Sequence, residues 1–357
     1  MVTVHPVLTP ADSRAFLRTC SFIYAAPMVW RPRDIRPFIA ASDYKAAGEV
    51  AHYLAVSEGK TVGRISVHVH PERPQGLFGL FECQANAEVA RHLLATAEDW
   101  LRSKGCTHAI GPIDPSAVVS GGVLVKGAGP NTEQMPYTAA WHADFLKDQG
   151  WSHLQAFQTW SFEPKIPKQV RQMSNAVAQK PGLKVLPLTS LKRPEALEVL
   201  TKIYNESYKG TFGFVPVSVR DLGAWLGFPD RVDPSTSLVA FVNEVPAAFA
   251  ITMIERTALS NTGSSLSQTV QRILLERRFT PDRLRVALFG VVPEFRGSAL
   301  GGLSLHMYVK LTQAMIEHRI ASGILTWTAA HDEVTAAGLS LIGAVPEHTY
   351  EIFAKEL

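Results

Sequence analysis

The 357-residue sequence has no apolar run long enough to cross a bilayer and no basic start followed by an apolar stretch of signal-peptide length. It has only three cysteines, and their spacing matches neither a zinc site nor a disulfide framework. Its net charge of +3 does not demand a nucleic-acid partner. These absences predict a cytoplasmic, metal-free globular protein that does not associate with membranes, and they leave its oligomeric state open.

The chain is long enough for two domains, and both halves fit one order of strands and helices. We expect domains at 1–163 and 164–357, joined by a proline-containing segment. In the first half we expect strands at 2–7, 52–56, 62–69, 76–83, 107–110 and 154–162, and helices at 10–24, 87–104 and 141–149. In the second half we expect strands at 238–243, 246–255, 286–292, 321–328 and 348–355, and helices at 194–208, 219–227, 269–278, from 300 onward, and 332–342.

The most informative segment is the apolar run at 286–292, which leads through Pro293 into a glycine-containing loop. After this loop, Leu300 begins an expected helix whose apolar residues repeat at helical spacing. Backbone N–H groups at a helix start attract anions, and Arg296 adds a guanidinium that can form paired hydrogen bonds to a phosphate. The segment therefore predicts a site for a phosphate-bearing ligand.

The spacing Arg296-x-x-Ala299-x-Gly301 resembles the Arg/Gln-x-x-Gly-x-Gly/Ala signature of the GCN5-related N-acetyltransferase (GNAT) superfamily, in which this turn holds the pyrophosphate of coenzyme A. Ala299 stands where that family prefers glycine. The resemblance implies acetyl-CoA or another acyl-CoA as acyl donor. The implied contacts are the backbone N–H of Val291 or Val292 for the thioester oxygen, and Arg296, Gly297, Ser298, Ala299, Leu300 and Gly301 for the pyrophosphate.

Further phrases resemble a bacterial family of tandem GNAT-like proteins, most of them without an assigned substrate. They stand at 62–65, 79–83, 111–113, 135–137, 203–205 and 213–216, so the resemblance covers nearly the whole chain. It implies an α/β (α+β) fold with two tandem GNAT-like domains, each a mixed, mostly antiparallel central sheet flanked by helices. At the position of the phosphate loop, the first half has Glu88 and no arginine, so we expect one cofactor site, in the second half.

Acyl transfer to an amine needs a neutral amine, a polarised carbonyl, and a proton or positive field for the departing thiolate. Glu255 and His331 are candidate bases, against the alternatives of a solvated strand end and a surface turn. Many GNAT enzymes have a tyrosine acid in the helix after the fifth strand, where this chain has Leu339 and Ser340. Ser340 is a candidate to hold a water, and Tyr350 is a further possibility for the acid.

Four aromatic residues, Tyr204, Tyr208, Phe212 and Phe214, are the expected substrate contacts, with core packing as the alternative. Arginines gather in 256–285, around a serine-rich insert. They suit the 3′-phosphate of coenzyme A, the phosphates of RNA, or a plain solvated face.

The leading hypothesis is an acyl-CoA-dependent N-acyltransferase, most simply an acetyltransferase, that acts on the amine of a small molecule or biosynthetic intermediate. A second is an aminoacyl-tRNA-dependent transferase of GNAT-like fold, which the Fem-type peptidoglycan ligases exemplify. A third is a non-catalytic binding module that keeps the fold.

Overall fold

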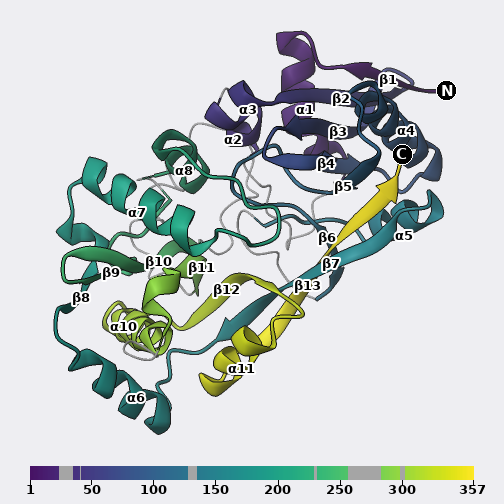
Figure 1. Ribbon diagram of the computed structural model, residues 1–357. Helices are drawn as coiled ribbons and strands as arrows, with labels where there is room; N and C mark the ends of the chain where they lie inside the picture. The colour runs from purple at the N-terminus through teal and green to yellow at the C-terminus, as the bar shows by residue number, and fades with distance from the viewer. Residues whose placement is uncertain (24–34, 41, 128–134, 229–230, 256–282, 298–301) are drawn as a thin grey trace, which may run out of the picture. The chain divides into compact units, whose positions relative to one another are not determined.

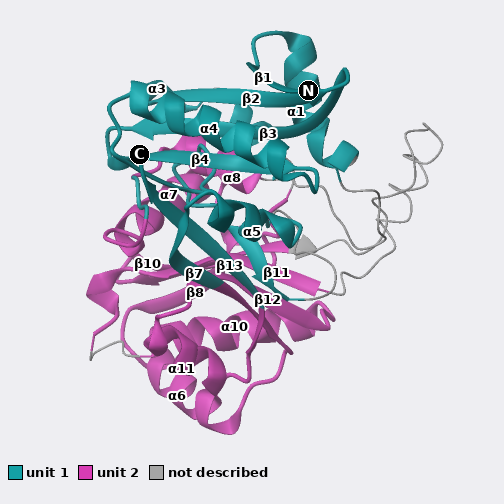
Figure 2. Ribbon diagram, turned by 90° about the vertical axis from the view of Figure 1, so that its right-hand side faces the viewer, with its two compact units in different colours: residues 1–157, 213–215, 348–357 teal, residues 158–212, 216–347 magenta. Residues whose placement is uncertain are grey.

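Strands and helices are mixed along the whole chain in the computed structural model, which describes residues 1–23, 35–40, 42–127, 135–228, 231–255, 283–297 and 302–357 (Figure 1). The chain divides into two units (Figure 2). Unit 1 comprises residues 1–157, 213–215 and 348–357, and unit 2 comprises residues 158–212 and 216–347. The expected boundary at residue 163 stays a prediction about independent domains. None of the described helices combines the length and the apolar character that a membrane span requires.

Unit 1 is built on a sheet whose neighbouring strands β1 to β4 are antiparallel, whereas β4 and β5 are parallel. Its strands are β1 (Val2–Pro6), β2 (Glu49–Ser57), β3 (Lys60–His70), β4 (Arg73–Cys83), β5 (His108–Gly111) and β6 (Val123–Lys126). Its helices are α1 (Pro10–Ile23), α2 (Arg36–Ile39), α3 (Asp43–Ala47), α4 (Ala87–Ser103) and α5 (Trp141–Asp148).

Strand β3 places two helices on opposite faces of this sheet, because successive side chains of a strand point to opposite sides. Ile65 packs in the core cluster that α4 shares, and a Cβ at Gly63 would lie 2.8 Å from Leu93 of α4. Arg64 points the other way and donates to the carbonyl of Phe16 in α1. The alternation in β3 therefore decides which helix covers which face.

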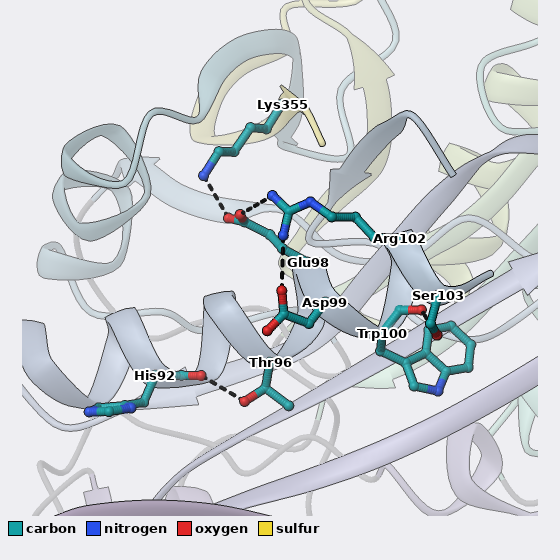
Figure 3. A network of polar contacts seen from close by, with 8 residues as sticks. All are labelled: His92, Thr96, Glu98, Asp99, Trp100, Arg102, Ser103 and Lys355. Atoms are coloured by element: carbon teal, nitrogen blue, oxygen red, sulfur yellow. Dashed lines mark hydrogen bonds and ion pairs between the residues drawn. The ribbon is translucent and has the colours of Figure 1, made fainter. Parts of the chain in front are cut away.

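The C-terminal strand β13 (Val345–Glu356) completes the sheet of unit 1 by pairing antiparallel with β5 and β6. Figure 3 shows how its end is held: the Lys355 ammonium donates to Glu98 of α4 at 2.7 Å, and Arg102 donates to the same carboxylate and to Asp99. Lys355 also donates to the carbonyl of Gln149. The last ten residues of the chain are thus fixed to the N-terminal unit.

A buried chain of hydrogen bonds ties residues 213–215 into unit 1. Arg73 donates to the carbonyl of Gly213 through Nε at 3.0 Å and Nη2 at 2.6 Å, and to the Tyr44 hydroxyl through Nη1. His68 Nε2 lies 3.0 Å from the carbonyl of Ile113, so this nitrogen must carry the proton. Its Nδ1 then accepts from Tyr44, so His68 is neutral. Each group in this series donates to the next, from Arg73 through Tyr44 and His68 to the Ile113 carbonyl.

Unit 2 repeats the same plan, with antiparallel neighbours β8 to β11 and a parallel pair β11–β12. Its strands are β8 (Leu183–Pro187), β9 (Leu238–Val242), β10 (Val245–Glu255), β11 (Arg283–Val291) and β12 (Ser322–Ala329), followed by the end of β7 (Ser152–Phe162). Its helices are α6 (Lys168–Ala178), α7 (Arg193–Ser207), α8 (Val219–Leu226), α10 (Leu303–Glu317) and α11 (Glu333–Leu341), with short 3₁₀ turns at Leu188–Ser190 and Pro293–Phe295.

Strand β10 likewise places helices of unit 2 on opposite faces of its sheet. Ala248 and Ala250 belong to the core cluster that includes α6 and α10, whereas Phe249 stacks with Tyr208 at the end of α7. Helix α7 therefore lies on the other face of the sheet and reaches β11, the strand that leads into the expected phosphate loop.

The sequence-based prediction of the fold class is confirmed, since each unit has a mixed, mostly antiparallel sheet flanked by helices. The prediction that a helix begins at Leu300 is wrong: α10 begins at Leu303, because Gly302 has a left-handed φ of 96° that cannot belong to an α-helix. Strands β6 and β8 and the short helices α2 and α3 were not predicted. The expected helix at 269–278 lies outside the described residues.

Candidate functional site

The candidate site of unit 2 begins where two parallel strands part. Strand β11 pairs with β12 only from Arg283, opposite Ser322, to Val286, opposite Leu325, although both strands continue for several residues. On its other side β11 stays paired with β10 as far as Val291. One edge of residues 287–291 is thus released from the sheet, and we call it the open edge of β11.

A β-bulge lies at the start of the open edge. Ile251 of β10 faces Leu288, and Thr252 faces Val286, so Ala287 is the extra residue of β11. Bulges bend a strand and change which way its groups point. Just before the bulge, the Thr326 hydroxyl donates to the carbonyl of Val286 and accepts from Nε of buried Arg285. Side chains therefore replace ladder hydrogen bonds where the strands separate.

The C-terminal end of α7 lies directly on β11, and a glycine makes this approach possible. A Cβ built on Gly290 would lie 2.5 Å from the Ser207 hydroxyl oxygen and 3.4 Å from the ring of Tyr208. The 2.5 Å contact is too short for a Cβ at position 290 unless the Ser207 side chain turns or α7 moves. The role of Gly290 follows from this contact between elements that are distant in the sequence.

Two side chains donate to carbonyl groups of β11 on the side away from β10. The Tyr208 hydroxyl donates to the carbonyl of Phe289 at 3.2 Å. Nε of Arg296 donates to the carbonyl of Val291 at 2.8 Å, and its Nη2 donates to the carbonyl of Ser207 at 2.7 Å. Arg296 therefore connects the end of β11 to the end of α7, a role that the sequence motif did not suggest.

Arg296 still has capacity for a ligand. A guanidinium has five N–H donors, and two of them are used in these contacts. Its other N–H groups have no hydrogen-bond partner among the described residues, and the side chain as a whole is exposed. One residue can thus brace the backbone and present positive charge at the same time.

The electrostatics of Tyr208 keep its proton in place. Burial raises the pKa of its hydroxyl to about 12, while the hydrogen bond to Phe289 and the nearby charge of Arg296 act in the opposite direction. Its ring stacks on that of Tyr204, with centroids 4.7 Å apart. Tyr208 is therefore a neutral donor held in a fixed orientation at the open edge.

Of the two N–H groups expected to bind a thioester oxygen, that of Val292 is engaged. It donates to the carbonyl of Ala247, on the β10 side. Because successive residues of a strand point their N–H groups to opposite edges, the N–H of Val291 points to the open edge instead. The geometry favours Val291 for the oxyanion contact.

The equivalent edge of unit 1 is closed by the chain itself. Strand β4 pairs with β5 only at Gly76 and Leu77, although it continues to Cys83. Backbone and side-chain groups of unit 1 bond to the remaining residues of this edge. The N–H of Ile113 donates to the Phe78 carbonyl, and Trp141 Nε1 donates to the Cys83 carbonyl. The Asp114 carboxylate accepts from the N–H of Leu80, and His142 Nε2 accepts from the N–H of Cys83.

The candidate catalytic residues lie on separate elements and turns. His331 is exposed in the turn before α11. Ser340 is exposed on α11, and its hydroxyl donates to the carbonyl of Ala336. Glu255 ends β10 opposite Arg283, with its side chain outside the described residues. Tyr350 is fully buried in β13. The structure brings none of the described side chains in this group together, and their roles stay predictions.

The four aromatic residues do not behave alike. Tyr204 is buried at 2% exposure and supports the ring of Tyr208. Phe212 and Phe214 are both partly buried, and they belong to different units. For Tyr204, packing is thus the role that the contacts show. Substrate contact by these residues stays a prediction.

Most of the proposed phosphate-binding residues cannot be placed. Ser298, Ala299, Leu300 and Gly301 lie outside the described residues, as do the arginines of segment 256–282. Gly297 is exposed and has open space where a Cβ would stand. Arg283 pairs with Glu347, and Arg285 is buried, so the two described arginines of the cluster serve internal contacts.

Comparison with known proteins identifies the fold. No family model matches the chain. The chain is 23% identical to protein YghO of Escherichia coli K12 over 380 residues, which span 99% of this chain and 95% of YghO. It is 27% identical over 237 residues to the bacterial ceramide synthase of Caulobacter vibrioides, which span 61% of this chain and 60% of that protein. A tandem GNAT protein from the clavulanic acid biosynthesis pathway matches with a TM-score of 0.59 and 14% identity, covering 100% of this chain and 98% of the other.

Proposed function

We propose that this chain, which has the tandem GNAT fold, is an acyl-CoA-dependent N-acyltransferase with a single donor site in unit 2. The contrast between the two units carries the proposal. Tyr208 and Arg296 donate to two carbonyls of the open edge of β11, so this edge presents mainly backbone N–H groups to an extended ligand. Along the equivalent edge of β4, groups of unit 1 bond to N–H groups as well as to carbonyls. Arg296 follows the open edge directly, where the diphosphate of an acyl-CoA donor needs positive charge.

Different residues of unit 2 bind different parts of the donor. The amide groups of the pantetheine arm exchange hydrogen bonds with the open edge, and the N–H of Val291 polarises the thioester oxygen. Arg296 and the backbone N–H groups of 297–301 bind the diphosphate. Acetyl is the acyl group to test first, and no metal takes part in this proposal.

A general base near the ends of the strands must deprotonate the amine. His331 is the first candidate, because an imidazole changes its protonation state near neutral pH. Glu255 and a water held by Ser340 are the alternatives. A His331→Ala variant should lose turnover while it keeps donor affinity, since His331 has no part in binding the donor.

The acceptor is an amine of a small molecule or biosynthetic intermediate in the cytoplasm. The similarity to a protein named as a ceramide synthase favours a long-chain amino alcohol as one acceptor class, because a ceramide carries an acyl group on such an amine. An acceptor panel should therefore contain sphingoid bases alongside short polyamines, amino sugars and amino acids.

Titration of the purified chain with acetyl-CoA by calorimetry tests the donor site, and native mass spectrometry counts the bound molecules. One bound molecule per chain supports the proposal. Two would contradict the closed edge of unit 1, and no binding of acetyl-CoA or longer acyl-CoA would overturn the donor assignment. Activity with charged tRNA that nuclease abolishes would then support the aminoacyl-tRNA hypothesis, and donor binding without turnover on any amine would support a binding module.

A further inference from the structure

We infer that Tyr208 is a catalytic residue of the proposed transfer, and that its hydroxyl delivers a proton to the departing thiolate. This inference rests on the proposed donor site and names a residue of it. It replaces the role of substrate contact that the sequence suggested for Tyr208.

The position of the hydroxyl supports this role. It lies 3.2 Å from the carbonyl oxygen of Phe289, two residues before Val291 on the open edge. A donor arm that pairs with this edge must run past both residues, since their backbone groups face the same side. The thioester, polarised at this edge, therefore lies beside the hydroxyl.

The side chain is also held in place. The ring of Tyr208 is fixed between Tyr204, at 4.7 Å between centroids, and Phe249, at 6.5 Å. The end of α7 rests on Gly290, and Arg296 binds the carbonyl of Ser207, the residue before Tyr208. A donor that is oriented before the reaction loses little free energy to reorganisation when charge develops.

Unit 2 offers no comparable proton donor at the expected place among its described residues. In α11, Leu339 has no acidic proton, and the exposed Ser340 hydroxyl is bonded to the carbonyl of Ala336 within its own helix. Tyr208 comes instead from α7, on the other side of the parting strands. The proton source has thus moved from one helix to another.

The step balances without an added reactant. The amine nitrogen attacks the thioester carbon and forms the C–N bond, and the collapse of the tetrahedral intermediate breaks the C–S bond, whose electron pair goes to sulfur. The Tyr208 hydroxyl gives its proton to that sulfur. The tyrosinate then regains a proton that the amine nitrogen releases, so the products are an amide and a free thiol.

Arg296 assists this cycle. Its positive charge favours the transient tyrosinate, and the burial that raises the pKa of Tyr208 to about 12 returns the group to its protonated form after each turnover. The Phe289 carbonyl orients the hydroxyl in the absence of donor and can accept an amide N–H of the arm when the hydroxyl turns to sulfur.

Removal of the hydroxyl tests the inference. In Tyr208→Phe we expect kcat to fall about 100-fold, the lower range for loss of general acid catalysis, while the Kd of acetyl-CoA changes by less than about threefold. Tyr308→Phe is the matched control, because it removes a hydroxyl from the core of unit 2 that donates to the carbonyl of Lys165, and it should keep kcat.

A change of leaving group separates catalysis from structure. The loss in Tyr208→Phe should shrink with an acetyl thioester of a more acidic aryl thiol, because that thiolate departs without a proton. An equal loss with both thioesters, or an unchanged kcat, would overturn the role of Tyr208. If the variant fails to fold, 3,5-difluorotyrosine at position 208 keeps the shape and lowers the hydroxyl pKa, and an unaltered kcat would then overturn it. Failure of the wild-type chain to bind acyl-CoA would instead refute the proposed function.

Discussion

Gly290 of β11 and Ser207 of α7 are in such close contact that a Cβ on the glycine would lie 2.5 Å from the serine hydroxyl oxygen and 3.1 Å from its Cβ. Helix α7 and strand β11 of the proposed donor site are therefore held in close contact. The hydrogen bonds from Tyr208 to Phe289 and from Arg296 to Ser207 each join α7 or its end to β11 or the loop after it, so they depend on this close contact.

Gly290→Ala should push α7 away from β11. We expect a loss of about 1–3 kcal/mol in the free energy of unfolding, the usual cost of overpacking, together with weaker donor binding. Urea unfolding and calorimetry measure the two effects. Gly338→Ala in α11 is the control, because nothing lies within 4 Å of its added Cβ, and it should be neutral or slightly stabilising. Equal behaviour of the two variants would contradict the close contact.

Arg296→Ala should weaken acetyl-CoA binding by about 1.5–3 kcal/mol, the range for a hydrogen bond to a charged group. It also leaves the carbonyls of Val291 and Ser207 without their donor, so we expect a loss of about 1 kcal/mol in stability. Arg296→Lys keeps the charge but not the paired geometry, and it should lie between the two in affinity. Reduced stability with unchanged affinity would show that Arg296 only braces the backbone.

Tyr44→Phe should destabilise unit 1, because the hydroxyl accepts from Arg73 and donates to His68 inside the protein. Its loss leaves the buried Nδ1 of His68 without a donor and removes one of the two acceptors of Arg73 Nη1, which costs about 1–3 kcal/mol. Tyr53→Phe is the matched control, since Tyr53 is only partly buried on β2. Guanidinium unfolding followed by a fluorescence signal from Trp151 reports on unit 1. A change below that of the control would mean that water satisfies these groups.

Acid should destabilise unit 1 well before its carboxylates titrate. Desolvation lowers the pKa of His52 and of His142 to about 4 and that of His68 to about 3, from an ordinary 6.5. Between pH 6.5 and pH 4 these histidines bind protons in the unfolded chain but not in the folded chain. Their contribution to the free energy of unfolding is therefore complete above pH 6.5 and is lost as the pH falls toward 4. Three such groups give a slope of up to about 4 kcal/mol per pH unit.

Urea midpoints between pH 7.5 and pH 4.5 measure this slope. His52→Gln should flatten this slope, because it removes one group that binds a proton in the unfolded chain but not in the folded chain. A midpoint for unit 1 that does not move across this range would contradict the buried neutral histidines.

Local chemistry made much of the fold predictable. Glu58-Gly59 and Asn243-Glu244 both adopt positive φ at the turns between pairs of expected strands. Asn86 caps α4 by accepting from the N–H of Glu88, directly before the helix expected at 87–104. These features depend on residues within a few positions of one another, so a single sequence contains them.

The donors at the open edge could not be predicted, because they depend on distant pairs. Tyr208 and Phe289 are 81 residues apart, and Ser207 and Arg296 are 89 residues apart. Periodicity placed each residue on its element, but it gave no information on which helix end meets which strand. The motif drew attention to Arg296 as a ligand for phosphate and gave no sign of its bonds to the backbone.

Because strand β13 belongs to the N-terminal unit, the order in which the ribosome makes the chain affects when that unit can fold. Residues 348–357 complete the sheet of the N-terminal unit, and Lys355 fixes that strand to α4. A ribosome that has made all of residues 1–157 has therefore not yet made the last strand of unit 1, and the edge of β5 stays unpaired through the whole translation of unit 2. A chain that lacks residues 348–357 would therefore lose a strand of unit 1, and the damage would lie in its N-terminal unit.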